Sequence, residues 1–135
     1  MIFWIASYPK SGNTWLRALI SSYYYSHDGI YTEENIKKIG QFPEKRYFTS
    51  FKYDQNIVTD TSRFWIEAQE KINEDRKLKF FKTHNAFGAL NNNQFTDNRN
   101  SVAVIYVIRD PRNVITSLKN HYELDNDQAV KWMIN

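Results

Sequence analysis

The sequence of 135 residues contains no cysteine. This absence excludes disulfide bonds, thiolate metal sites and a cysteine nucleophile. A strong charge of one sign is also lacking, because 18 basic residues stand against 15 acidic residues and the formal net charge is +3. Such a mild excess does not by itself indicate a nucleic-acid partner, and we expect none.

Long hydrophobic runs are missing as well. No run approaches the roughly 20 apolar residues that a transmembrane helix needs. The apolar start at residues 2–6 lacks the basic n-region of a signal peptide, and its run of about six residues is shorter than the usual range of about 7–15. We therefore expect a cytoplasmic protein that has no membrane partner.

The composition that remains is that of a folded domain. Hydrophobic residues make up 41% and aromatic residues 16%, which is too rich for a disordered chain. The length suits one domain with a real core. Because the sequence has no repeats and no linker, we expect a single domain over residues 1–135.

Short apolar segments that suit strands alternate with segments of helical period. We expect strands at residues 2–6, 78–83 and 102–108. The last of these is apolar throughout, as is typical of a parallel strand that is covered on both faces. Strands interleaved with helices indicate an α/β fold in which helices flank a central parallel sheet.

The helices are expected from their apolar period and from their end signals. The first runs from Asn13 or Thr14 to about Tyr25, and others span residues 33–39, 61–76 and 126–133, with one more beginning at Pro111. Side chains that can cap them are Thr32, Asp60 or Thr61, Asp110 and Asp125. Gly29 can take a left-handed conformation after the first helix.

Polar residues follow all three expected strands. The first strand leads into residues 7–12, the second into Lys82, Thr83 and His84, and the third into Arg109. In parallel α/β sheets, ligands bind beyond the carboxyl ends of the strands. One basic, hydroxyl-rich site at this edge of the sheet would therefore collect all three ends.

The loop after the first strand is suited to an anion. A strand, a loop of small residues and a helix start follow one another, and the first N–H groups of a helix have no intrahelical partner. Lys10 adds a full charge. The loop is not a Walker A motif, because Lys10 precedes Gly12 instead of following it. The alternative is a tight turn with a solvated lysine.

Three further side chains are candidates for chemistry at this edge. His84 could act as a general base toward an alcohol or amine, or it could be a surface histidine. Arg109 could grip a second anion, or it could pair with Asp110 or another nearby carboxylate. Trp15 could offer a flat surface to a nucleobase, or it could pack in the core.

The remaining histidines, His27 and His121, lack such a setting and are expected to be structural. The three histidines together have no metal-ligand spacing, so we expect no metal site. The aromatic segment from Tyr31 to Asp60 could line an acceptor pocket or serve as packing, and packing is favoured.

At these residues the chain resembles the cytosolic-type sulfotransferase superfamily, whose donor is 3′-phosphoadenosine 5′-phosphosulfate (PAPS). Residues 8–16, YPKSGNTWL, resemble the loop that holds the 5′-phosphosulfate, where the family often has threonine at the place of Asn13. Residues 82–84, KTH, resemble the strand end that carries a catalytic histidine. Residues 108–117, IRDPRNVITS, resemble the motif for the 3′-phosphate.

The resemblance implies a P-loop-like, three-layer fold and an enzyme that needs no metal. Lys10 would stabilise the leaving group, and His84 would accept the proton of a hydroxyl or amine on a small-molecule or glycan acceptor. Trp15 would stack near the adenine. Residues implied in holding the two anionic groups of the donor are Lys10, Ser11, Gly12, Asn13 and Thr14 for the 5′-phosphosulfate, and Arg109 and Ser117 for the 3′-phosphate.

The resemblance also implies a catalytic domain about twice as long as this chain. We therefore expect an N-terminal portion of that domain, whose three strands leave sheet edges uncovered. A truncated, non-catalytic nucleotide- or phosphate-binding module is the alternative function. A P-loop-like kinase is a third option, which lacks the Walker A order.

Overall fold

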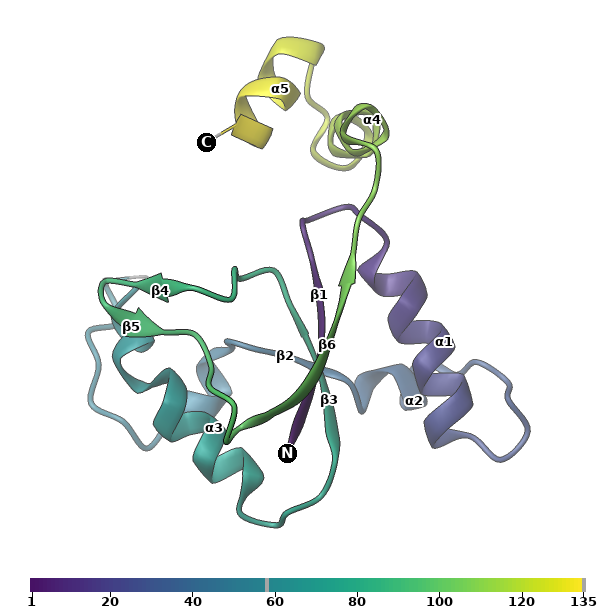
Figure 1. Ribbon diagram of the computed structural model, residues 1–135. Coiled ribbons are helices and arrows are strands. Elements are labelled where there is room, and N and C mark those ends of the chain that lie inside the picture. The colour runs from purple at the N-terminus through teal and green to yellow at the C-terminus, as the bar shows by residue number, and fades with distance from the viewer. Residues whose placement is uncertain (58, 135) are drawn as a thin grey trace.

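The computed structural model describes residues 1–57 and 59–134. Within these residues, four parallel strands form the central sheet in the order β2-β3-β1-β6 (Figure 1). They are β1 (Ile2–Ser7), β2 (Gly40–Gln41), β3 (Lys79–Thr83) and β6 (Ser101–Val107). The expected α/β fold with a central parallel sheet is confirmed.

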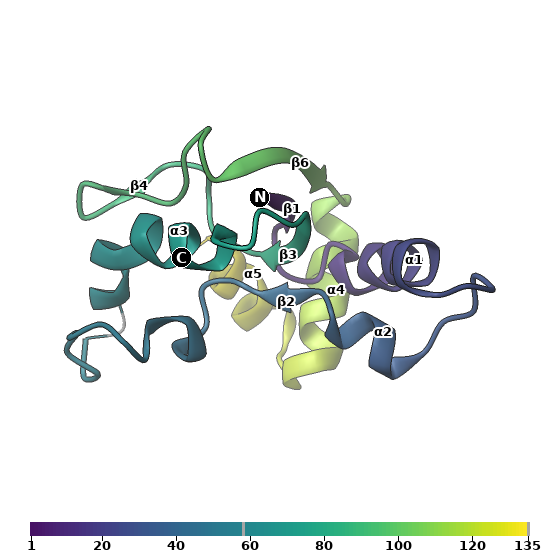
Figure 2. The ribbon, with the colours of Figure 1, turned by 90° about the horizontal axis from the view of Figure 1, so that it is seen from below.

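Helices lie on both faces of the sheet. Figure 2 shows α1 (Asn13–Tyr25) and α2 (Glu33–Lys37) on one side and α3 (Trp65–Asn73) on the other. Two 3-10 segments, η1 (Lys45–Phe48) and η2 (Asp60–Phe64), and a small hairpin of β4 (Ala89–Leu90) and β5 (Asn93–Gln94) complete the side of α3. No helix in residues 1–57 and 59–134 is long and apolar enough to cross a bilayer.

The last two helices, α4 (Pro111–Tyr122) and α5 (Asn126–Ile134), pair with each other beyond the carboxyl end of β6 (Figure 1). Val114, Leu118 and Ala129 form the buried contact between them. The hydroxyl of Tyr8, in the loop after β1, donates a hydrogen bond of 3.1 Å to the carbonyl of Met133. This pair of helices therefore stands over the edge of the sheet where the strand ends meet.

Side chains alternate across β1 and divide the core between the two faces. Ile2 and Trp4 enter the larger cluster on the side of α3, while Ile5 packs on the side of α1. β3 continues the division, with Phe81 in the larger cluster and Phe80 in the smaller one. This period of two is what a strand covered on both faces produces.

Three of the predicted helix caps are confirmed, and one is wrong. Thr32, Asp110 and Asp125 each accept a hydrogen bond from a backbone N–H two or three residues further on, at 2.8–3.1 Å. No side chain caps the 3-10 turn that precedes α3. The carboxylate of Asp60 is bound instead by Arg63, at 2.6 Å, and by a loop N–H.

The expectation that residues 102–108 are covered on both faces is wrong. Among the described residues β6 pairs with β1 alone, so that it forms an edge of the sheet. Its side chains Val102, Val104, Ile105 and Tyr106 are 39–61% exposed. An uncovered sheet edge was itself expected, but an apolar run does not show which strand forms it.

In the described part of the segment from Tyr31 to Asp60, most aromatic side chains serve as packing, as favoured above. Phe42 and Phe48 are buried in the larger core cluster, and Tyr47, Phe51 and Tyr53 pack against it. The same segment also lines a surface hollow of about 710 Å³. Because this hollow shares no residue with the pocket described below, it gives no support to an acceptor role for the segment.

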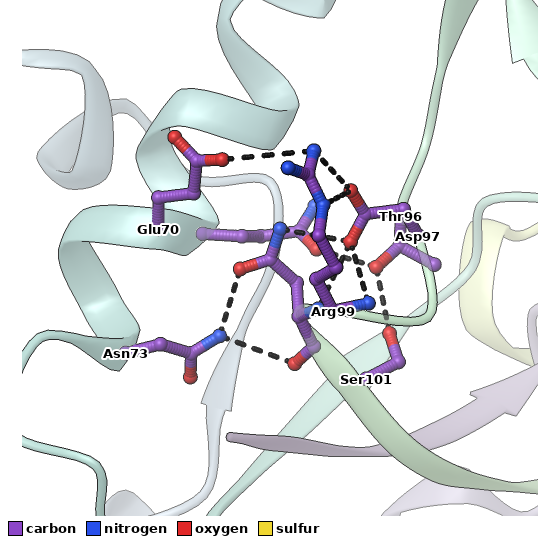
Figure 3. Close-up of polar contacts among 8 residues, drawn as sticks. Glu70, Asn73, Thr96, Asp97, Arg99 and Ser101 are labelled. Carbon is purple, nitrogen blue, oxygen red and sulfur yellow. Dashed lines mark hydrogen bonds and ion pairs between the residues drawn. The ribbon is translucent and has the colours of Figure 1, made fainter.

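A polar network ties the turn before β6 to α3 (Figure 3). The amide of Asn73 donates to the backbone carbonyl and to the side-chain oxygen of Asn100, at 3.1 and 3.0 Å. The carboxylate of Asp97 accepts from the backbone N–H of Asn100 at 2.9 Å and from the guanidinium of Arg99 at 3.1 Å. The network fixes where β6 begins.

We expect Asp97→Asn to lower the free energy of unfolding by about 1 kcal/mol at neutral pH, because charge-assisted hydrogen bonds are lost. Burial raises the pKa of Asp97, but the bonds from Asn100 and Arg99 outweigh it and the pKa lies below 3.8. The stabilisation is therefore present above pH 3.8 and lost as the pH falls through the lower pKa of the folded state. Urea unfolding at several pH values measures this loss. The control is Asp127→Asn, on the exposed start of α5. If the free energy of unfolding of the two variants depended on pH in the same way, the predicted contribution of Asp97 would be contradicted.

Candidate active site

A pocket of about 630 Å³ opens where the carboxyl ends of β1, β3 and β6 meet. The loop after β1 supplies one wall, Lys82 and His84 come from the end of β3, and Arg109 follows β6. The described residues that line the pocket include no aspartate and no glutamate. The predicted convergence of the three strand ends on one basic site is thus what the fold produces.

The loop between β1 and α1 turns sharply at two left-handed residues, Lys10 (φ 65°) and Gly12 (φ 108°). The N–H of Ser11 closes the turn on the carbonyl of Tyr8 at 3.2 Å. No side chain caps α1, and its first turn holds no acidic residue. The partial positive charge of this helix start is therefore not compensated by the described part of the protein.

Three cations line the pocket, and none of them forms an ion pair within the described residues: Lys10, Lys82 and Arg109. Arg109 donates to the carbonyl of Lys10 at 3.1 Å, while Asp110 pairs with Arg112 at 2.6 Å. The alternative of an Arg109–Asp110 pair is thus excluded. Unpaired cations close to one another favour an anionic ligand.

The positive charges of this edge affect one another. Burial lowers the pKa of Lys82, and the charges of Arg17 and Lys10 lower it further, against an opposing effect of Glu44. Such crowding stores repulsion that an anion would relieve. No group of three or more His, Cys, Asp or Glu side chains able to hold a metal ion occurs in residues 1–57 and 59–134.

His84 is half-buried, and one of its two ring nitrogens forms a hydrogen bond with the backbone. Its Nδ1 lies 2.7 Å from the backbone carbonyl oxygen of Ser7. A carbonyl can only accept, so Nδ1 carries the hydrogen in the neutral ring and Nε2 carries the lone pair. Burial lowers the pKa of His84 from 6.5, the bond to Ser7 raises it, and Lys82 lowers it again. The lowered pKa keeps the ring neutral at pH 7, so that Nε2 can accept a proton.

Eight of the nine site residues expected from the sequence line this pocket: Lys10, Gly12, Asn13, Thr14, Trp15, His84, Arg109 and Ser117. Ser11 is buried and lines a neighbouring pocket of about 200 Å³ instead. Trp15 is 78% exposed, which excludes the alternative of core packing. The amide of Asn13 turns away from the pocket toward β1.

Five further residues line the pocket and were not among the nine expected site residues: Pro9, Lys82, His121, Tyr122 and Trp132. His121 was expected to be structural and away from the site, but it lines the pocket. The rings of Tyr122 and Trp132 stack with centroids 5.5 Å apart. The sequence places Lys82 at this edge as part of the strand end that carries His84, but it assigns Lys82 no role there. The aromatic residues Tyr122 and Trp132 reach the pocket only through the packing of α4 on α5.

Comparisons with known proteins indicate the family of the chain. Residues 2–132 match the family model described as the sulfotransferase domain. The luciferin sulfotransferase of Photinus pyralis is 32% identical over 125 residues, which cover 89% of this chain and 32% of that relative. The chain therefore spans about a third of the length of the curated relative. No solved structure matches. The chain belongs to the sulfotransferase domain family.

Proposed function

We propose that the chain is a PAPS-dependent sulfotransferase of the cytoplasm, which transfers a sulfuryl group to a hydroxyl or amine of a small-molecule or glycan acceptor. The observation that carries the proposal is the set of unpaired cations Lys10, Lys82 and Arg109 around a neutral His84, in a pocket whose described lining has no acidic residue. The luciferin sulfotransferase relative supports an acceptor of the small-molecule kind.

The donor carries two anionic groups, and the pocket offers two cationic places. In this proposal the 5′-phosphosulfate lies at the uncapped start of α1, where Lys10 and the hydroxyl of Thr14 add to the backbone N–H groups. The 3′-phosphate lies between Arg109 and Ser117, which both line the pocket. The exposed ring of Trp15 stacks near the adenine. The domain over residues 1–135 would then hold both phosphate motifs.

The reaction follows from these positions. The acceptor oxygen or nitrogen attacks the sulfur in line, and the bond between sulfur and the bridging phosphate oxygen breaks. The proton of the acceptor passes to Nε2 of His84, and the negative charge collects on the departing adenosine 3′,5′-bisphosphate. Lys10 stabilises that charge, so positioning and electrostatics supply most of the catalysis. No step requires a metal.

A second candidate is a nucleotide- or phosphate-binding module that does not transfer the group. The exposure of Trp15 and Arg109 favours it, because transfer chemistry benefits from the exclusion of water. Incubation with ³⁵S-labelled PAPS and a panel of phenols, alcohols and amines separates the two. Labelled acceptor supports the sulfotransferase. Donor binding without labelled product supports the module, and absence of both contradicts each of them.

We expect Arg109→Ala to weaken the binding of adenosine 3′,5′-bisphosphate by about 10- to 100-fold, because one charged hydrogen-bonding partner is lost. Titration calorimetry measures the affinity, and the ligand-induced rise in melting temperature should shrink in parallel. The control is Arg112→Ala, whose guanidinium binds Asp110 and does not line the pocket. Equal weakening in both variants would show that the ligand responds to the net charge of the protein and not to a specific contact with Arg109.

A further inference from the structure

Asn13 is a buried polar residue at the start of α1, only 5% exposed. Its amide nitrogen donates to the carbonyl of Ile5 at 2.9 Å and to the hydroxyl of Ser7 at 3.1 Å. Both hydrogens of the amide are thereby donated to residues in the last part of β1. Its oxygen Oδ1 is buried without a partner in the described residues. A buried asparagine that leaves one atom unsatisfied is costly, which calls for a specific role.

Asn13 and His84 both form hydrogen bonds with Ser7. Nδ1 of His84 lies 2.7 Å from the Ser7 carbonyl oxygen and 3.3 Å from the Ser7 hydroxyl. Two adjoining bonds from Asn13, to Ile5 and to Ser7, therefore fix the backbone segment that receives the imidazole. A chain of hydrogen bonds runs from α1 through the end of β1 to the ring.

We propose that Asn13 is a positioning residue, which clamps the end of β1 so that His84 stays in the Nδ1–H tautomer and presents Nε2 to the pocket. The amide nitrogen then acts through Ser7 and not on the donor. The catalytic meaning of this role rests on the proposed function, in which Nε2 takes the proton of the acceptor. The charged side chains that line the pocket with His84 are Lys10, Lys82 and Arg109, and none of them can accept its Nδ1 hydrogen.

The tautomer can be observed directly in the chain as it stands. Long-range ¹H–¹⁵N correlation of the imidazole rings, recorded at a pH where His84 is neutral, distinguishes a protonated from an unprotonated nitrogen. In the wild type we expect His84 to show a protonated Nδ1 and an unprotonated Nε2. In Asn13→Ala both nitrogen resonances of His84 should shift toward an average of the two tautomers. The resonances of exposed His27 serve as the internal control and should not shift.

A folded Asn13→Ala chain whose His84 keeps a fully protonated Nδ1 would overturn the inference. If Asn13→Ala does not fold, Ser7→Ala provides the test, because it removes one acceptor of the clamp and should shift the resonances in the same direction. Ser7→Thr keeps the hydroxyl, so the His84 resonances of this variant should stay at their wild-type positions. An unshifted Ser7→Ala spectrum would contradict the positioning role of Asn13. Since the spectra need no donor, a wild type with a fixed tautomer that binds no bisphosphate would contradict only the proposed function.

Discussion

Replacing His84 with glutamine is expected to lower the rate of sulfuryl transfer by about 10²- to 10⁴-fold, the usual contribution of a general base. Glutamine keeps a polar side chain that can bond to the Ser7 carbonyl, but it cannot accept a proton from the acceptor. Donor binding should change little, because His84 offers no charge at neutral pH. The loss therefore falls on turnover and not on affinity.

The measurement is transfer from ³⁵S-labelled PAPS under single-turnover conditions, beside calorimetric titration with adenosine 3′,5′-bisphosphate. His27→Gln is the matched control, since His27 is exposed and does not line the pocket. Unchanged transfer in His84→Gln would remove the base from the proposed mechanism. Loss of binding together with transfer would indicate that His84 acts in holding the donor.

The pH dependence of the wild type gives the same residue a second test. The reactive form of His84 is neutral, so the rate falls as the pH drops through its pKa. Burial, with Lys82, places that pKa below 6.5 despite the hydrogen bond that Nδ1 donates to the Ser7 carbonyl. The acid limb of the rate profile should therefore lie below pH 6.5 and be absent from the residual activity of His84→Gln. A limb above pH 6.5 would contradict this assignment.

Replacing Trp4 with alanine is expected to lower the free energy of unfolding by about 3–5 kcal/mol, as for other buried tryptophans. Trp4 is 0% exposed and lies at the centre of the larger core cluster. Its ring centroid is 5.1 Å from that of Phe95 and 5.8 Å from that of Phe42. Its Nε1 also donates to the hydroxyl of Ser101 at 2.7 Å, which joins β1 to the start of β6.

Urea unfolding followed by far-UV circular dichroism measures this loss. The same substitution at Trp15 is the control, because Trp15 is 78% exposed and should change stability by no more than about 0.5 kcal/mol. If Trp15→Ala destabilised the chain as much as Trp4→Ala, the division between core and pocket would be wrong.

Much of the fold follows from local patterns. The apolar run of β1 and the capping side chains Thr32, Asp110 and Asp125 are short-range signals, and the structure confirms them. The helix expected over residues 61–76 is shorter than its period suggests, because it begins as a 3-10 segment and is α-helical only from Trp65 to Asn73. The meeting of the three strand ends also follows, because the carboxyl ends of parallel strands lie at one edge of a sheet. The sequence therefore places His84 and Arg109 near the loop that carries Lys10.

Features that depend on long-range packing could not be predicted in this way. β2 is two residues long, too short to show a period, and it exists only because it pairs with β3. The apolar sequence of β6 suits a central strand, yet the pairing leaves it at the edge. Trp132 belongs to the pocket only because α5 folds back on α4. The roles of the site residues in chemistry stay predictions that the experiments above test.

The central claim is that one pocket at the carboxyl edge of the sheet binds a nucleotide with two anionic groups. Titration of the ¹⁵N-labelled chain with adenosine 3′,5′-bisphosphate, followed by backbone ¹H–¹⁵N spectra, tests it most directly. We predict saturable shifts of the resonances of Gly12, Thr14, Arg109 and Ser117, with adenosine 5′-monophosphate leaving the last two nearly unshifted. Shifts that do not saturate, or that gather on the hollow beside η1 instead, would contradict the claim.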